Sequence, residues 1–287
     1  MRIETTKNGS ENLYFDSWLE CVDYSANRPY KLQYTESSRM IGGHYGAGFT
    51  GVNTFAEALE LAHKGWSEGT AHIKKLSANL VERVTREVSQ DAIQFDVTGM
   101  DYDVGTYLMG APEHWYSMEK QAGEGKVVRI IHNINASAGV DKAVITAKGA
   151  AIVALVECLE LARVRVEVVV VSTTGEWSEE SYRLSTFVTV KQASQPLDID
   201  MMAFAIAHPA SLRRIMFGVW EGSERFMRDY HYGYGSVSPV PKFYAKHGDG
   251  TIIIEKSYLY EPQWSNPEAA TAWVMNSLKE QGVKMVE

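Results

Sequence analysis

A strand, a long helix and a second strand follow one another in the middle of this chain, and their order constrains the fold more than any other feature. Residues 126–133 and 164–172 are apolar runs typical of buried strands. Residues 141–162 carry apolar side chains at helical spacing. Strands joined by a crossover helix lie parallel, because a tight turn joins only antiparallel strands. The sequence therefore predicts an α/β fold with a mostly parallel sheet flanked by helices in three layers.

Further elements surround this unit. Thr54 and Glu57 form a capping box, which predicts a helix that ends at Gly65. The other expected elements are helices at 70–88, 198–208, 211–230 and 267–281, and strands at 92–97, 115–120, 182–191 and 251–256. We expect residues 1–122 to form N-terminal helix and strand additions packed on an α/β core of residues 123–287, or the whole chain to be one intimate domain.

Composition limits the compartment and the partners. The formal net charge is −8, so any binding to nucleic acid needs a local basic patch. Cys21 and Cys158 are too few for a disulfide framework, which fits a reducing compartment. The longest apolar run is far shorter than the ~20 residues that a bilayer requires. We therefore expect a cytoplasmic protein without a membrane partner.

Sequence motifs for catalysis are missing. The segment Gly46–Gly51 matches the dinucleotide fingerprint by its letters, but no buried strand precedes it, as that motif requires. The chain has no HExxH, P-loop, GxSxG or catalytic Cys–His signature. We expect no catalytic residue, no metal and no cofactor, and we interpret the chain as a binding module. An enzyme built from scattered residues is an alternative without positive support.

Residues 133–137, Asn-Ile-Asn-Ala-Ser, lie between the first buried strand and the long helix, where open α/β sheets place their ligands. The run from Arg129 to Val171 resembles the first strand, metal-site loop and helix of a von Willebrand A-like domain, which implies a von Willebrand A-like or Rossmann-like second half. That family's loop reads Asp-x-Ser-x-Ser and binds magnesium. Asn133 and Asn135 stand here for the Asp and the first Ser, so the resemblance implies a degenerate loop without metal. Capping of the helix from Asp141 is the alternative role.

A wider resemblance covers roughly residues 15 to 172. Its marks are Phe15-Asp16-Ser17-Trp18, the segment from Phe49 to Trp66, and Tyr102-Asp103-Val104-Gly105. These residues are similar to a domain family common in phages that has no settled activity. By its size and character the chain also resembles the single-stranded-DNA-binding RNA polymerase cofactors of certain podoviruses. That resemblance implies single-stranded DNA and a phage RNA polymerase as partners, in the host cytoplasm.

Residues 211–247 carry the features that such a partner requires. This window holds six Lys or Arg against three acidic residues, and eight aromatic residues are interleaved with them. Cations that contact phosphates beside rings that stack on bases are typical of sequence-tolerant single-strand binding. The predicted phosphate contacts are Arg213, Arg214, Arg225, Arg228, Lys242 and Lys246, and the predicted stacking residues are Tyr232, Tyr234, Phe243 and Tyr244.

Helical projection of residues 211–230 places Arg214, Phe217, Arg225 and Arg228 on the exposed side, opposite the other apolar residues. The alternative is an ordinary amphipathic helix with a solvated basic face, followed by a tyrosine loop that packs on the body. The hypothesis is a non-enzymatic, single-stranded-DNA-binding phage transcription cofactor that holds melted promoter DNA and recruits a phage RNA polymerase. The competing function is a protein-interaction adaptor with a degenerate metal-site loop and no role in nucleic-acid binding. Self-association into a homo-oligomer would fit cooperative binding along a strand, although no heptad pattern indicates it.

Overall fold

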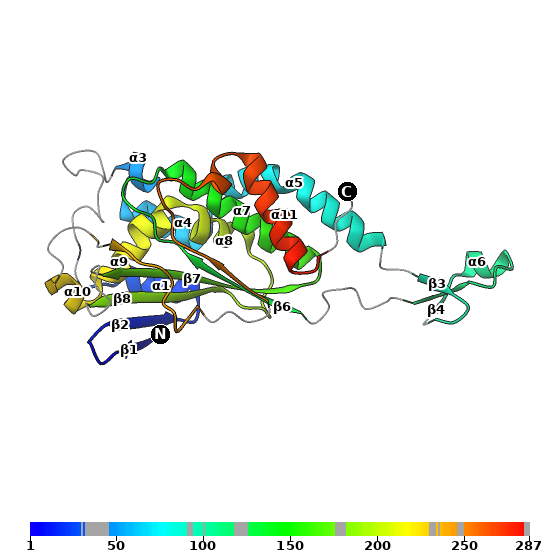
Figure 1. The fold of residues 1–287 in the computed structure, drawn as a ribbon, viewed down its shortest axis with the longest axis horizontal. Coiled ribbons are helices and arrows are strands. Elements are labelled where there is room, and N and C mark those ends of the chain that lie inside the picture. The colour runs from blue at the N-terminus through cyan, green and yellow to red at the C-terminus, as the bar shows by residue number, and fades with distance from the viewer. Residues whose placement is uncertain are drawn as a thin grey trace.

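The computed structural model describes residues 1–29, 31, 46–90, 94–99, 101–117, 126–175, 182–229, 234, 236–245 and 250–283. Its centre is a sheet in the order β1-β2-β8-β7-β6-β10, with β9 paired to β7 (Figure 1). The strands are β1 Arg2–Thr5, β2 Glu11–Phe15, β6 Val127–Asn133, β7 Arg165–Gly175, β8 Arg183–Lys191, β9 Ser236–Val237 and β10 Thr251–Ile254.

The sheet is mixed. The predicted strand–helix–strand unit is confirmed, because β6 and β7 pair in parallel with Val127 opposite Arg165. The pairs β6–β10 and β2–β8 are also parallel. In contrast, β8 runs antiparallel to β7, which precedes it in the chain, and β1 runs antiparallel to β2. The α/β class is therefore confirmed, with both strand directions present.

Helices cover one face of this sheet (Figure 1). Every residue from Lys148 to Val156 on α7 is buried, because α7 lies against the sheet and against α5, α8 and α11. Asp141 caps α7 and Thr54 caps α4, as their sequences predict. The helices are α1 Trp18–Ala26, α3 Ala47–Thr50, α4 Phe55–Lys64, α5 Ser67–Gln90, α7 Lys142–Leu161, α8 Ile199–Ala207, α9 Phe217–Glu221, α10 Glu224–Asp229 and α11 Pro267–Glu280, with a π-helix η1 at Ser211–Met216 and a 3-10 turn η2 at Pro262–Trp264.

The single helix predicted at 211–230 is wrong. The segment divides into η1, α9 and α10, with a break at Gly222 and Ser223. Strands β1 and β2 and helix α1 are additions that the element prediction did not contain.

The strands separate two apolar clusters, because alternate side chains point to opposite faces. Ile130 and Val168 join the large core beneath the helices. Ile131 and Val169 join a small cluster on the other face, where Val240 from the segment after β9 packs on them. This second face is the one that the described helices of Figure 1 leave uncovered.

A second, three-stranded sheet lies apart from the main body. Its strands are β3 Gln94–Asp96, β4 Asp101–Tyr102 and β5 Trp115–Ser117, in the order β3-β5-β4. Helix α6, Val104–Leu108, connects β4 to β5 and is capped by Asp103. We call the described residues between Gln94 and Ser117 the arm. Figure 1 shows that the arm projects from one end of the body.

Candidate nucleic-acid interface

The structure separates the predicted binding residues into buried and exposed sets. Arg213 and Arg214 are both buried in η1. The expected exposure of Arg214 is therefore wrong. The physical reason is that η1 contacts α1, α3, α4 and α8, so helices surround it where the projection assumed solvent. Tyr232 and Lys246 lie outside the described residues.

Arg213 is a structural cross-link. Its guanidinium donates to the carbonyl oxygens of Phe49 at 2.8 Å and Val140 at 2.6 Å, and it stacks over the Phe49 ring at 3.7 Å. Burial lowers the pKa of Arg213 to about 10, which still leaves it charged at neutral pH. Arg214 donates to the carbonyl oxygen of Asn53. These arginines fix the segment that contains the dinucleotide-like glycines, and they are not available to phosphate.

Two further predicted residues also serve the body. Arg225 donates to the carbonyl oxygen of Gly9 at 2.7 Å and lies over the Tyr182 ring. Tyr234 stacks on Phe217 with ring centroids 3.8 Å apart, and its hydroxyl donates to Glu221. The predicted alternative, a tyrosine loop packed on the body, describes Tyr234 correctly. Arg228 is exposed on α10.

The remaining predicted residues lie together on the second face of the main sheet. Lys242 and Phe243 are exposed, and Tyr244 is half-buried. The Tyr244 ring packs on Phe187 of β8 with centroids 4.2 Å apart, and Phe243 meets the same ring edge-on at 5.9 Å. The body therefore holds the backbone of this segment in place, while Lys242 and Phe243 reach solvent.

Phe187 is the centre of a row of rings and cations that crosses the sheet. Tyr14 of β2 stacks on Phe187 at 4.9 Å, and the Arg2 guanidinium lies 4.4 Å from the Tyr14 ring centroid. On the other side, Arg129 of β6 lies over the Tyr244 ring and donates to its hydroxyl at 2.8 Å. We call this row the aromatic face, and its members are Arg2, Tyr14, Arg129, Phe187, Lys242, Phe243 and Tyr244.

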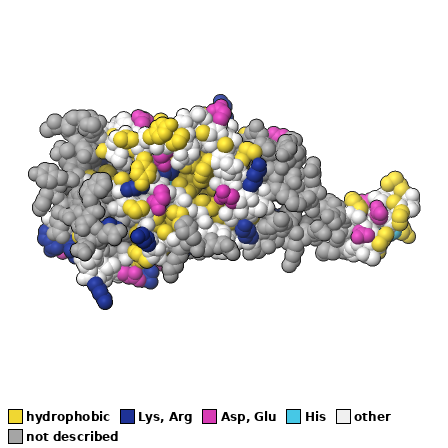
Figure 2. Space-filling view, in the orientation of Figure 1, with side chains coloured by type: hydrophobic (Ala, Val, Ile, Leu, Met, Phe, Trp, Pro, Cys, Tyr) yellow, Lys and Arg dark blue, Asp and Glu magenta, His cyan; other side chains and the backbone are white. Residues whose placement is uncertain are grey.

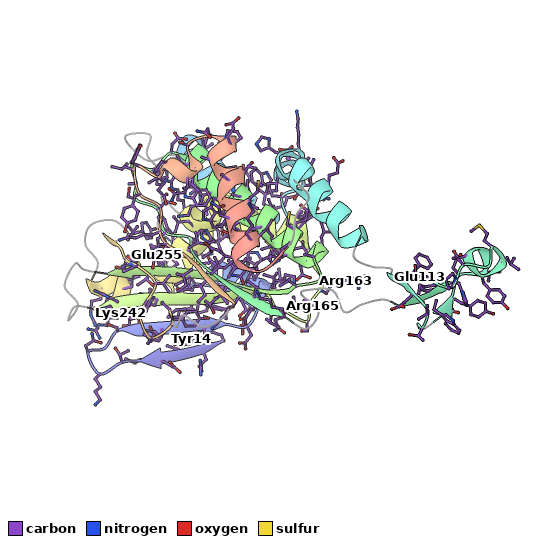
Figure 3. All side chains as sticks on the ribbon, turned by 45° about the vertical axis from the view of Figure 1, so that its right-hand side comes forward. Tyr14, Glu113, Arg163, Arg165, Lys242 and Glu255 are labelled. Carbon is purple, nitrogen blue, oxygen red and sulfur yellow. The ribbon has the colours of Figure 1, made fainter. Side chains whose placement is uncertain are left out.

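Sequence reasoning missed the other four members, Arg2, Tyr14, Arg129 and Phe187. A signal existed for Arg129, because a cation between Val128 and Ile130 in an apolar strand marks the face opposite the core. Figure 3 shows Tyr14 and Lys242 together on the strand side of the molecule, below the helices.

Carboxylates moderate the charge of the aromatic face. Arg2 pairs with Glu4 at 3.3 Å, and Arg129 pairs with Glu167 at 2.8 Å. Burial, with the Glu4 carboxylate as the next cause, raises the pKa of Tyr14 to about 12, so this phenol is neutral at neutral pH. A bound phosphate would have to compete with two carboxylates for the two arginines, whereas Lys242 forms no ion pair with the residues that the structure describes.

The loop from Asn133 to Ser137 is closed by internal hydrogen bonds. The Asn133 amide donates to the Ser238 carbonyl at 2.9 Å and accepts from the Asn135 backbone. The Asn135 amide donates to the carbonyl oxygen of Thr173 and accepts from the Ser172 hydroxyl at 2.7 Å. Both buried amides are thus used for structure. In the part of the chain that the structure describes, no group of three or more His, Cys, Asp or Glu could hold a metal ion.

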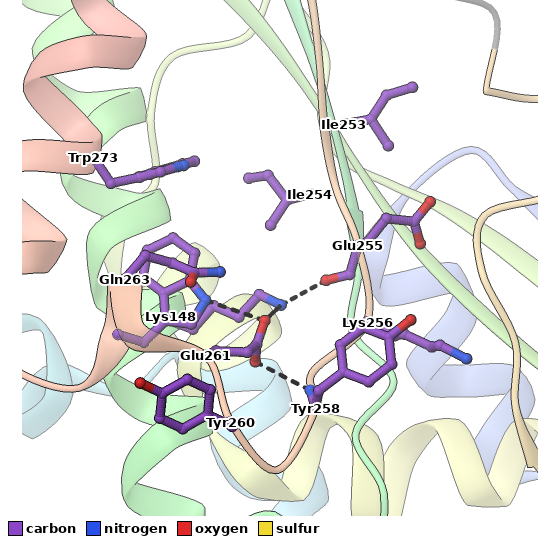
Figure 4. Close-up of a pocket in the computed structure, with 11 residues that line it drawn as sticks. Lys148, Ile253, Ile254, Glu255, Lys256, Tyr258, Tyr260, Glu261, Gln263 and Trp273 are labelled. Carbon is purple, nitrogen blue, oxygen red and sulfur yellow. Dashed lines mark hydrogen bonds and ion pairs between the residues drawn. The ribbon is translucent and has the colours of Figure 1, made fainter.

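A cavity of about 320 Å³ lies beside β10 and α11 (Figure 4). Lys148 lies in its wall and donates to the Glu255 carbonyl at 2.5 Å, to Glu261 at 3.2 Å and to the Ser257 hydroxyl at 3.3 Å. Burial lowers the pKa of Lys148, and Glu261 opposes that shift. An ammonium has three donors, so these three acceptors satisfy it and leave none for a ligand.

The fold and the aromatic face define a mixed α/β protein with a candidate binding surface on one face of its main sheet. Residues 4–284 match the model of a family described as a domain of unknown function (DUF7192), so the chain belongs to that family. No curated protein and no solved structure matches the chain. Among the described residues, none of the helices has the length and apolar character that a membrane crossing requires.

Proposed function

We propose that this protein binds single-stranded DNA through the aromatic face, by binding alone and without catalysis. The observation that carries the proposal is a row of three rings, Tyr14, Phe187 and Tyr244, with an arginine at each end. Rings that stack on bases beside cations that contact phosphates give sequence-tolerant binding of single strands. Duplex DNA keeps its bases stacked on one another, so it cannot use these rings in the same way.

One ring of the aromatic face is open to a base, and a second becomes open when Arg2 moves away from it. Phe243 is 51% exposed. One face of Tyr14 packs on Phe187, and Arg2, whose side chain is 66% exposed, covers the ring as well. A base could displace Arg2 from Tyr14, and the released guanidinium would then contact a phosphate.

The wider role that we propose is that of a phage transcription cofactor, which holds melted promoter DNA and recruits a phage RNA polymerase in the host cytoplasm. Its support is the resemblance of the sequence to podoviral cofactors, together with a surface suited to single strands.

We also propose that the second half of the chain is distantly related to von Willebrand A-like domains. The support is the parallel β6–α7–β7 unit and the position of Asn133–Ser137 at the carboxyl end of β6. In this proposal the loop has kept its place in the fold while its polar groups bond to the body.

Fluorescence anisotropy of a labelled single strand, compared with its duplex at two salt concentrations, tests the proposed binding. The variant is Lys242→Gln/Phe243→Ala on the aromatic face. The matched control is Lys256→Gln/Tyr258→Ala, because Tyr258 is 55% exposed and has the Lys256 ammonium 5.4 Å from its ring centroid.

We expect salt-sensitive binding that prefers the single strand, is weakened by the first variant and is retained by the control. Equal weakening by both variants, or no binding at low salt, would refute the aromatic face as the site. The second candidate function is a protein-interaction adaptor, and the exposed apolar residues of the arm favour it. A protein interface of that kind depends much less on salt than phosphate binding does.

A further inference from the structure

The arm exposes more apolar surface than its small sheet can bury. Leu108 and Met109 at the end of α6 are 76% and 79% exposed, and Val104 and Tyr107 on the same helix are also exposed. Edge-to-face aromatic pairs, such as Tyr102 with Trp115 at 5.6 Å, connect the elements of the arm, and Tyr102 itself is 47% exposed. Exposed apolar residues that gather in one place mark interaction surfaces.

The charge of the arm has a single sign. The sequence from Gln94 to Ser117 contains four carboxylates, at Asp96, Asp101, Asp103 and Glu113, and no Lys or Arg. Figure 2 shows hydrophobic and acidic side chains next to one another over the arm. A complementary partner surface would therefore combine apolar side chains with cations.

The body of the same chain carries such a surface at the root of the arm. Val127 is 52% exposed at the start of β6, and Arg165 is its partner in the adjacent strand. Leu161 and Arg163, at the end of α7, are also exposed. We call Val127, Leu161, Arg163 and Arg165 the root patch. Figure 3 shows Arg163 and Arg165 at the end of the body from which the arm projects, with Glu113 on the arm itself.

We propose that two copies of this chain associate by reciprocal contact, in which the arm of each copy docks on the root patch of the other. Charge complementarity and exposed apolar side chains on both surfaces carry this inference. The arm projects away from its own root patch, so a second copy is what can bring the two surfaces together (Figure 3). A two-fold arrangement uses both surfaces twice and closes at a dimer. This inference does not depend on DNA binding.

Sedimentation velocity of the full chain over a wide concentration range tests the dimer. We expect the wild type to dimerise and Leu108→Ser/Met109→Ser to remain monomeric. Leu259→Ser is the matched control, because Leu259 is 77% exposed on the body, and this variant should dimerise like the wild type. A monomeric wild type, or a dimer that survives the double substitution, would overturn the proposal. Circular dichroism shows whether each variant is folded.

A charge exchange tests which surfaces meet. Arg165→Glu should weaken dimerisation, since it places a carboxylate opposite the acidic arm. Adding Glu113→Arg to the same chain should restore it, because each copy then presents a cation to the other copy's new carboxylate. Failure of the pair to restore dimerisation would contradict the docking of the arm on the root patch. Binding of single-stranded DNA by the monomeric variant would show that the two proposals succeed or fail separately.

Discussion

Two arginine–aromatic clusters of this protein differ in their access to solvent. In η1, Arg213 lies over the Phe49 ring and donates hydrogen bonds to the backbone carbonyl groups of Phe49 and Val140. On the aromatic face, Arg2 lies over Tyr14 at a similar distance, yet its side chain remains mostly exposed. The same pair of residue types therefore supports the fold in one place and offers a binding surface in the other. Burial, and not composition, separates the two roles.

The difference predicts that substitutions near η1 change stability, while substitutions on the aromatic face change binding. The largest effect is expected for Glu221→Gln. Glu221 forms a fully buried ion pair with Arg28 and accepts from the Tyr234 hydroxyl at 2.6 Å. Removing one partner of a buried pair leaves the other charge uncompensated, which costs about 3 to 5 kcal/mol. Urea denaturation measures this loss in the free energy of unfolding.

Glu224→Gln is the control for that measurement, because Glu224 is an exposed carboxylate at the start of α10. Its effect should stay within about 0.5 kcal/mol. If Glu221→Gln were equally neutral, the buried pair would not stabilise the body.

The second largest effect is a dependence of stability on pH. His208 packs edge-on against Trp66 and stacked on Phe204, and its Nδ1 accepts from the Ala210 backbone. Burial lowers the pKa of His208 from 6.5 to about 4. The unfolded state therefore binds the proton first, and the free energy of unfolding falls as the pH decreases from 6.5 to 4. The expected loss from this group is roughly 3 kcal/mol.

Comparison with His208→Asn isolates this contribution from that of the carboxylates. The Asn side-chain oxygen can still accept from Ala210, but it does not titrate. Denaturation curves at several pH values should show a shallower decline for the variant between pH 6.5 and 4. Parallel declines would mean that His208 is not the group responsible.

The sequence predicts elements that depend on local interactions better than elements that depend on contacts between distant segments. The strands β6 and β7 and helix α7 follow from local periodicity, and Asp141 and Thr54 mark helix starts by local hydrogen bonds. The strands β1 and β2 were not predicted, and β2 joins the main sheet through its pairing with the distant β8, which no local pattern records.

The candidate site shows the same limit. The aromatic and basic residues near Lys242 were predicted from the sequence, and Phe243 and Tyr244 lie on the aromatic face. The exposure of Arg214 was predicted wrongly because a helical projection contains only the residues of one helix and does not include the elements that surround it. Tyr14 joins the face through its contact with Phe187, more than 170 residues later in the sequence, and Arg2 joins it through Tyr14, so no local pattern records the face.

Two tyrosine substitutions, one on the aromatic face and one in the packed body, test whether binding and stability separate. Tyr14→Leu removes a stacking ring from the aromatic face and leaves an apolar side chain on Phe187. We expect it to weaken single-strand binding by about 1 to 3 kcal/mol. Tyr234→Leu removes the stack on Phe217 and the hydrogen bond to Glu221, so it should lower stability without changing the affinity of the folded protein.

Anisotropy and urea denaturation of both variants provide the two readouts. The reverse result, with Tyr234→Leu weakening binding more than Tyr14→Leu, would place the DNA near α9 and not on the aromatic face.

The smallest expected effect concerns one phosphate contact. Lys242 is exposed next to Phe243, so a strand stacked on that ring would bring a phosphate within its reach. Lys242→Gln should reduce the slope of log affinity against log salt by ~0.7, the value for one neutralised phosphate on a single strand. Lys142→Gln, an exposed cation at the start of α7 on the helical side, should leave the slope unchanged. An equal reduction of the slope by both lysine substitutions would indicate that phosphates interact with diffuse positive charge. The aromatic face would then not differ from the rest of the surface in phosphate binding.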